Sequence, residues 1–155
     1  MKNKGIRISD IIDGKCISLC ELLLSIPDIS SMNWSLLWLD AVSVKNEGEI
    51  IMKLQTKTNN SQDGLPCTFE SLIEVSKKVF QEIEILIIGC KNKVYCHRYK
   101  DDQEMYETCD ITIEMIDGGY WEIFSKNIDW INYLASRYTE VEFIDTDFQK
   151  SMEIS

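Results

Sequence analysis

The chain contains 155 residues, of which 45% are hydrophobic and 27% are charged, a composition that predicts one folded domain and excludes a disordered chain. No apolar stretch is long enough to span a bilayer, and Asp10 and Asp13 lie where a secretory signal would be apolar, so we expect a cytoplasmic protein without a membrane segment. The net charge of −10 disfavours direct binding of nucleic acid, because acidic side chains repel phosphates.

A strand and a helix are predicted at the start of the chain. Ile6 and Ile8 alternate with polar residues, which favours a strand. Over about residues 15–25, apolar side chains recur every three or four positions, the spacing that gives a helix one apolar side. Pro27 ends this pattern, so we expect a short helix that packs against the core.

A hairpin and a second helix follow. Residues 34–44 and 49–57 are rich in β-branched or other apolar side chains and flank a turn at residues 46–48, so we predict that they pair as two strands. The polar residues 58–66 form the longest predicted loop. Thr68 then lies where a hydroxyl side chain caps the first turn of a helix, which we expect to carry one buried side.

The middle of the chain predicts a second hairpin. Residues 83–90 form a nearly continuous apolar run, which is typical of a central strand. Residues 94–99 are predicted to return beside that strand. The acidic residues 101–107 are expected to form a loop after it.

A third hairpin, with strands within residues 109–116 and 120–124, has a register that side-chain parity determines. A two-residue loop would place buried side chains opposite exposed ones. A three-residue loop pairs Met115 with Trp121 on the core side, and a glycine in the loop supplies the left-handed conformation that such a turn needs. We therefore predict the three-residue loop at residues 117–119.

The last elements are a helix over residues 127–138, capped by Ser125 or Asn127, and a short strand within residues 139–145. Together the elements predict a single α+β domain covering residues 1–155. We expect a mainly antiparallel sheet of about seven or eight strands with three helices.

The side chains that most often carry catalysis are sparse. The six cysteines are expected to be reduced thiols, because no secretory signal places them in an oxidising compartment and there is no CxxC motif. His97 is the single histidine, and it falls in a predicted strand rather than beside a nucleophile. No glycine-rich phosphate-binding motif occurs. We therefore expect no catalytic residue, no metal site and no cofactor.

The charge is distributed unevenly. Residues 1–100 hold 13 basic and 12 acidic side chains, a net +1, whereas residues 101–155 hold 3 basic and 14 acidic side chains, a net −11. Such an asymmetry attracts a cationic partner and accelerates the encounter with it. The alternative is that the acidic surface only keeps the protein soluble.

The predicted register of the third hairpin places Glu114 and Glu122 opposite each other on the outer face of the sheet. Like charges in such a pair destabilise a sheet. The pair could serve as a general acid and base, or it could receive an Arg or Lys of a partner. Alternatively, a nearby lysine such as Lys126 relieves the repulsion and the pair has no function.

Aromatic and methionine side chains mark further candidate surfaces. Met105 and Tyr106 lie among the carboxylates of the predicted acidic loop, a mixture that suits a protein interface. On the last helix, Trp130 and Tyr133 are predicted along a flank, where they either cover the edge of the sheet or anchor a partner. Trp34 and Trp38 are expected to share one face of a strand, in the core or around a pocket.

The opening GIRI strand and the late segment CDITIEMIDGGYWEIFSK resemble those of a family of small uncharacterised bacterial proteins, which has no assigned activity. In its general character the chain is also similar to the immunity proteins encoded beside bacterial polymorphic toxins, including those of contact-dependent growth inhibition. Those proteins are small, single-domain, cytosolic, often acidic and free of catalytic motifs. The residues that carry the first likeness are Trp34, Cys109, Asp110, Asp117, Tyr120 and Lys126.

The second resemblance implies a non-enzymatic protein that neutralises a cationic toxin domain, such as a nuclease, through an acidic surface. The alternatives are a small-ligand-binding or carboxylate-dependent enzyme domain, and an inhibitor that imitates the charge of nucleic acid. The partner contacts expected on the leading hypothesis are Asp101, Asp102, Glu104, Met105, Tyr106, Glu107, Glu114 and Glu122, with Trp130 and Tyr133 as possible anchors.

Overall fold

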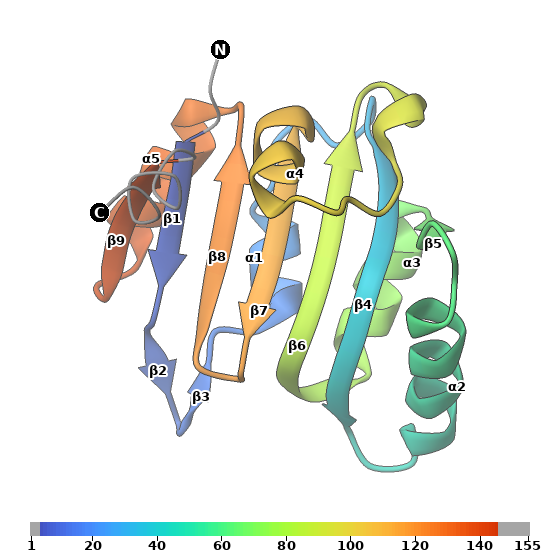
Figure 1. The fold of residues 1–155 in the computed structure, drawn as a ribbon. Coiled ribbons are helices and arrows are strands. Elements are labelled where there is room, and N and C mark those ends of the chain that lie inside the picture. Colours follow the sequence, from blue (N-terminus) through green and yellow to red (C-terminus); the bar gives the residue numbers. More distant parts are fainter. Residues whose placement is uncertain (1–3, 146–155) are drawn as a thin grey trace.

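A seven-stranded sheet forms the centre of the computed structural model, which describes residues 4–145 (Figure 1). Every pair of neighbouring strands is antiparallel, and the order across the sheet is β5-β4-β6-β7-β8-β1-β9. A separate two-stranded sheet pairs β2 with β3. The strands are β1 (Lys4–Ile8), β2 (Ile11–Ile12), β3 (Lys15–Cys16), β4 (Asn33–Ser43), β5 (Leu65–Cys67), β6 (Val79–Cys90), β7 (Ile111–Ile116), β8 (Tyr120–Ser125) and β9 (Val141–Asp145).

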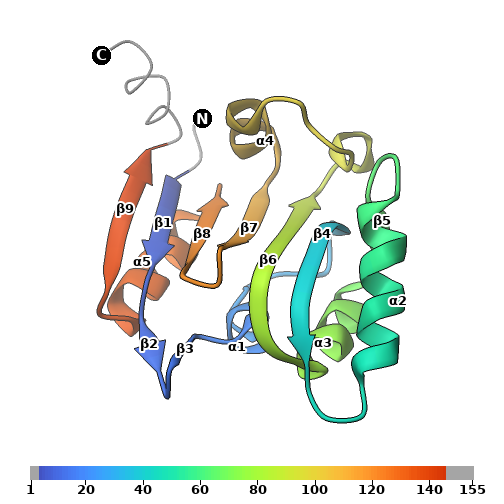
Figure 2. The same ribbon diagram turned by 60° about the horizontal axis from the view of Figure 1, so that its bottom comes forward.

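The helices divide the sheet into two different faces. Helices α1, α3 and α5 cover one side of the sheet, which we call the helical face (Figures 1 and 2). Helix α4 lies across part of the other side, which we call the open face, and α2 lies beside the end of the sheet formed by β4 and β5. No helix among the described residues is long and apolar enough to cross a membrane. The helices are α1 (Leu19–Leu24), α2 (Gly48–Asn59), α3 (Phe69–Lys77), α4 (Asp102–Thr108) and α5 (Ile128–Arg137), with a 3₁₀ turn η1 at Lys93–Tyr95.

The main core lies between the sheet and the helices of the helical face. Alternate side chains of each strand point into this layer, because successive residues of a strand face opposite sides. Trp121 of β8 is completely buried there, and its indole N–H donates to the carbonyl of Ile17 at 2.8 Å. Burial of such a large apolar surface is the main force that stabilises the domain. The α+β class and the mainly antiparallel sheet are therefore as predicted.

The third hairpin has the predicted register. Met115 pairs with Trp121, and residues 117–119 form the three-residue loop between β7 and β8. Asp117 and Gly118 adopt left-handed conformations, with φ of 50° and 64°. The predicted capping residue of α3 is also confirmed, because the Thr68 hydroxyl accepts from the N–H of Ser71 at 3.1 Å. Asn127 rather than Ser125 caps α5, since its side chain accepts from the N–H of Trp130.

The predicted first hairpin is wrong, because residues 49–57 belong to helix α2 rather than to a strand. This helix runs beside β4 and supplies hydrogen bonds that a neighbouring strand would otherwise make. The side-chain amide of Asn59 donates to the carbonyl and accepts from the N–H of Leu39, both at 2.9 Å, and Gln55 accepts from the N–H of Ala41 at 2.9 Å. The edge of β4 is thus satisfied by side chains, which protects it from pairing with another chain.

The predicted second hairpin is also wrong. Residues 94–99 do not pair with β6, and Arg98 from this segment instead reaches the end of α2. Residues 101–107 are not a loop, because residues 102–108 form α4, whose first turn is capped by the Asp101 carboxylate accepting from the N–H of Gln103. The described residues therefore contain five α-helices instead of three.

One buried carboxylate links the sheet to the start of α1. Glu82 of β6 is 6% exposed and accepts from the N–H of Leu19, the first residue of α1, at 2.6 Å. That N–H has no partner within its own helix, so the carboxylate performs the role of a capping group. Burial raises the pKa of Glu82, while the Leu19 hydrogen bond opposes the increase.

We expect Glu82→Ala to lower the free energy of unfolding by about 1 to 2 kcal/mol, because it leaves the Leu19 N–H buried without an acceptor. Urea denaturation of both proteins measures the difference. Glu82→Gln serves as the control, since it keeps an oxygen acceptor while removing the buried charge, and it is expected to keep the native stability or exceed it at neutral pH. Equal stability of the Ala variant and the native protein would show that this hydrogen bond does not hold α1.

Candidate functional site

The open face of the sheet is partly covered and partly accessible. Under α4 lies a second apolar cluster, in which the ring of Tyr106 stacks on Phe124 of β8 with 4.1 Å between centroids. Away from α4, polar and charged side chains of β4, β6, β7 and β8 occupy this face. This accessible part is the candidate site.

Glu114 and Glu122 lie directly opposite each other on β7 and β8, as the register predicted. Each has its own partner. Arg7 of β1 donates to the Glu122 carboxylate at 3.0 Å, and the Tyr106 hydroxyl donates to Glu114 at 3.1 Å. Lys126 does not relieve this pair, because its ammonium lies 3.4 Å from the carboxylate of Asp110 instead.

Glu114 is the carboxylate with the most unusual environment on this face. Burial raises its pKa to about 7, and the hydrogen bond from Tyr106 opposes part of this increase. The negative charges of Asp102, Glu122 and Glu84 raise the pKa further. Glu114 therefore keeps its proton to a higher pH than an unperturbed glutamate does.

This raised pKa predicts a pH-dependent stability. Because the folded pKa exceeds the value of 4.5 for an unperturbed group, the destabilising effect of Glu114 is absent below about pH 4.5, grows as the pH rises to about 7, and is complete above it. Glu114→Gln is then expected to be more stable than the native protein by about 1 to 2 kcal/mol at pH 8 and nearly equal to it at pH 4.5. Urea denaturation at both pH values measures this difference, and a gain of equal size at both would exclude the titration of Glu114 as its cause.

Three further carboxylates of this face were missed by the sequence analysis as a group. Asp40 of β4 lies directly opposite Glu84 of β6, and Asp117 of the β7–β8 loop is close enough to Glu84 to share a hydrogen bond, which raises the Glu84 pKa. We call Asp40, Glu84, Glu114 and Asp117 the carboxylate face. None of the four is in an ion pair with another described residue.

Trp38 lies beside the carboxylate face and is 41% exposed. It pairs with Leu86, the residue that also lies opposite Glu114, so the indole borders the acidic cluster. The prediction that Trp34 and Trp38 share one face is wrong, because the register of β4 shifts between Leu36 and Trp38. This irregularity turns Trp34 into the core of the helical face and leaves Trp38 on the open face.

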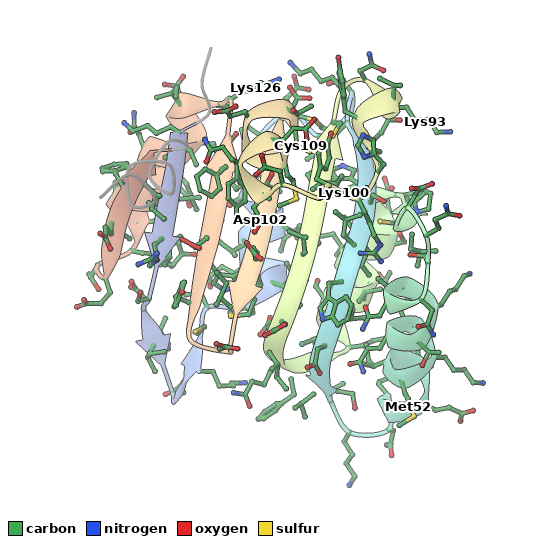
Figure 3. The ribbon with its side chains drawn as sticks, viewed as in Figure 1. Met52, Lys93, Lys100, Asp102, Cys109 and Lys126 are labelled. Atoms are coloured by element: carbon green, nitrogen blue, oxygen red, sulfur yellow. The ribbon has the colours of Figure 1, made fainter. Side chains whose placement is uncertain are left out.

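Helix α4 extends the acidic surface above the carboxylate face. Asp101, Asp102 and Glu104 are exposed, and Glu107 is half-buried and accepts from Gln103. Figure 3 shows Asp102 where α4 crosses the front of the sheet. Asp101, Asp102 and Glu104 of the predicted contact surface are therefore accessible, whereas Glu107, Glu114 and Glu122 are partly buried.

Three of the side chains predicted as aromatic or methionine contacts are buried in the structure. Met105 and Tyr106 are 2% and 5% exposed, since they form the side of α4 that packs on the sheet. Trp130 is 2% exposed and donates its indole N–H to the hydroxyl of Ser25. Tyr133 is 48% exposed but belongs to α5 on the helical face, so the structure does not bring it together with α4.

Neither metal-binding clusters nor disulfides occur within residues 4–145. No group of three or more His, Cys, Asp or Glu side chains in this range has the arrangement of a metal site. All six cysteines are free thiols. His97 stacks on the ring of Tyr99, with 4.3 Å between centroids, rather than lying beside a nucleophile.

Comparison with known proteins adds no relative from which a role could be transferred. No protein family, curated protein or solved structure matches the chain. The functional argument therefore rests on the geometry and charge of the open face.

Proposed function

We propose that this protein is a non-enzymatic immunity protein of the bacterial cytoplasm, which neutralises a cationic toxin domain by binding it through an acidic surface. The observation that carries the proposal is the carboxylate face, where Asp40 and Glu84 oppose each other beside the exposed indole of Trp38 and neither forms an ion pair with a residue of the range 4–145. Carboxylates and an accessible aromatic ring are the side chains that a basic protein surface contacts favourably.

The physical basis is that like charges held together on a sheet lower its stability. The repulsion between these carboxylates lowers the stability of the free protein, and Arg or Lys side chains of a partner would relieve that repulsion on binding. A nuclease domain must present basic side chains to the phosphates of its substrate, so its active-site surface has the required charge. Electrostatic attraction between the two surfaces would also accelerate their encounter.

The charge repulsion can be measured without a partner. We expect Glu84→Gln to raise the free energy of unfolding at pH 7 and low salt, because it removes one of two opposed carboxylates. The gain should shrink in 0.5 M salt, since salt screens the repulsion in the native protein. Glu49→Gln is the control, because Glu49 lies 3.0 Å from Lys53 in an exposed ion pair. A loss of stability in Glu84→Gln would contradict the repulsion.

Co-expression tests the proposed function itself. The gene is placed beside the open reading frame immediately upstream of it, and the C-terminal region of that frame is induced with and without this protein. The proposal predicts growth arrest that this protein relieves, and a complex of the two proteins on purification. A harmless upstream product, or arrest that persists despite this protein, would overturn the immunity function.

A further inference from the structure

A cavity of about 950 Å³ lies on the helical face, away from the carboxylate face. It is formed where β4, β5, α2 and α3 meet the segment that follows α1, a region at the right of Figure 1. This volume is in the range of sites that hold small organic ligands. Its walls are mainly apolar and include Ile29, Met32, Leu36, Leu65, Phe69 and Leu72.

Trp34 brings an unusual polar group to this cavity. Its side chain lines the cavity and is 3% exposed, yet its indole N–H has no hydrogen-bond partner within residues 4–145. The other two buried indoles, Trp121 and Trp130, both donate to an oxygen. A buried donor without an acceptor is uncommon in proteins, which indicates that an acceptor of another molecule belongs there.

The orientation of the Trp34 ring follows from its contact with Gly89 of β6. The ring atoms Cε3, Cζ3 and Cη2 lie 3.0, 2.8 and 3.1 Å from the position that a Cβ would occupy on this glycine, so the flat face of the indole lies over β6 at this point. The ring also packs against Phe69 of α3, with 5.7 Å between centroids. Within the sheet, Trp34 pairs with Cys67 of β5, another residue that lines the cavity.

The thiols of the cavity do not add charge to it. Burial raises the pKa of Cys67 to about 12, and burial also raises the pKa of Cys96 to about 12. Both thiols are neutral at physiological pH and behave as small apolar groups. The cavity thus offers apolar contacts, the Trp34 donor and a few neutral polar side chains, Ser30, Asn33, Thr68 and Ser71.

Charge at the cavity is carried by three exposed side chains, Lys57 of α2, Lys93 of η1 and Glu70 of α3. Neither lysine is in an ion pair with another described residue. Figure 3 shows Lys93 at the end of the sheet where β6 leaves it. Two lysines against one glutamate give this cavity a positive excess in a chain whose net charge is −10.

We propose that this cavity binds a small carboxylic acid with an apolar body, whose oxygen accepts from the Trp34 indole while Lys57 and Lys93 attract its negative charge. The apolar walls bury the body of the ligand. This inference concerns the helical face and is independent of the proposed function, which concerns the open face. The two sites are therefore tested separately.

The experiment titrates the full-length, ¹⁵N-labelled protein with octanoate and, separately, with 1-octanol, a neutral molecule of the same chain length. The indole N–H signals are followed by NMR, after each has been assigned with a Trp→Phe variant. We expect both molecules to shift the Trp34 signal in a saturable way, and octanoate to bind more tightly. The Trp121 signal should stay in place, because that N–H already donates to Ile17.

Variants separate the contribution of the donor from that of the charges. Trp34→Phe is expected to weaken binding of both molecules by about tenfold, since it removes the hydrogen bond. Lys57→Gln combined with Lys93→Gln should weaken octanoate roughly fivefold and leave octanol unchanged. Lys53→Gln is the matched control, because Lys53 lies on the same helix outside the cavity.

Three results would overturn the proposal. They are absence of saturable binding of either molecule, binding that leaves the Trp34 signal unshifted, and an equal loss of octanoate affinity in the Lys53 control. The first two are read on the native protein, so they remain decisive if Trp34→Phe does not fold. If octanoate and octanol do not bind the cavity, the co-expression test of the open face is unaffected. If the co-expression test fails, the titration of the cavity is likewise unaffected.

Discussion

Reversing two charges of the acidic surface, Glu84→Lys and Glu104→Lys, is expected to slow association with the cationic partner by about 100-fold at low salt. Glu84 belongs to the carboxylate face and Glu104 to α4, and both side chains are exposed. The variant replaces attraction by repulsion over the whole approach of the partner. The association rate is measured by stopped-flow fluorescence with the co-purified partner between 20 and about 500 mM salt.

The control for this variant changes the net charge equally at another place. Glu49→Lys and Glu74→Lys lie on α2 and α3, where each glutamate is in an exposed ion pair with a lysine. Such pairs contribute little to stability, so the control should remain folded. We expect its association rate to fall by less than about fivefold and to keep a strong salt dependence. Equal slowing of the two variants would mean that net charge, rather than the open face, governs the encounter.

Arg98→Ala is expected to lower the free energy of unfolding by about 3 kcal/mol, the largest effect on stability among the predicted changes. The Arg98 guanidinium donates to the carbonyl of Thr58 at 2.8 Å, to the carbonyl of Ser61 at 3.0 Å, and to the carbonyl of Leu37. It thereby joins the end of α2, the bulge of β4 and the segment that leads to α4. Truncation leaves these partly buried carbonyls without a donor.

Urea denaturation measures this loss, and Arg98→Lys is the control. Lysine keeps the positive charge but cannot form the planar fork that reaches several carbonyls at once, so an intermediate stability is expected. A change below about 0.5 kcal/mol in Arg98→Ala, the size of an ordinary surface substitution, would show that this network does not hold α2 to the sheet.

The predictions from sequence succeeded where the determining interactions are local. The register of the third hairpin depends on side-chain parity within residues 111–125, and Met115 does pair with Trp121. The caps of α3 and α5 depend on side chains that bond backbone three residues further on, at Thr68 and Asn127. A pattern contained in a few residues carries enough information for such features.

The predictions failed where distant parts of the chain decide the structure. Residues 49–57 are helical because Gln55 and Asn59 bond the edge of β4, an interaction that no local pattern contains. Residues 101–107 are a helix rather than a loop because Met105 and Tyr106 pack on the sheet, and their burial stabilises a short helix. The same packing removes both side chains from the surface on which they were predicted.

The carboxylate face could be foreseen only in part. The opposition of Glu114 and Glu122 follows from one hairpin, whereas the opposition of Asp40 and Glu84 requires the pairing of β4 with β6 across the intervening α2, β5 and α3. The shift of register before Trp38 also changes which side chains share its face. An irregularity of this kind has no reliable signal in a single sequence.

The measurement that tests the central claim most directly is oxidative footprinting of the protein with and without its co-purified partner. Trp38 on the open face, Met52 on α2 and Tyr133 on α5 are 41%, 67% and 48% exposed, so each is oxidised in the free protein. Binding through the open face predicts that the oxidation of Trp38 falls severalfold, while that of Met52 and Tyr133 stays the same. Unchanged oxidation of Trp38 in the complex, or protection of Tyr133 instead, would contradict the claim.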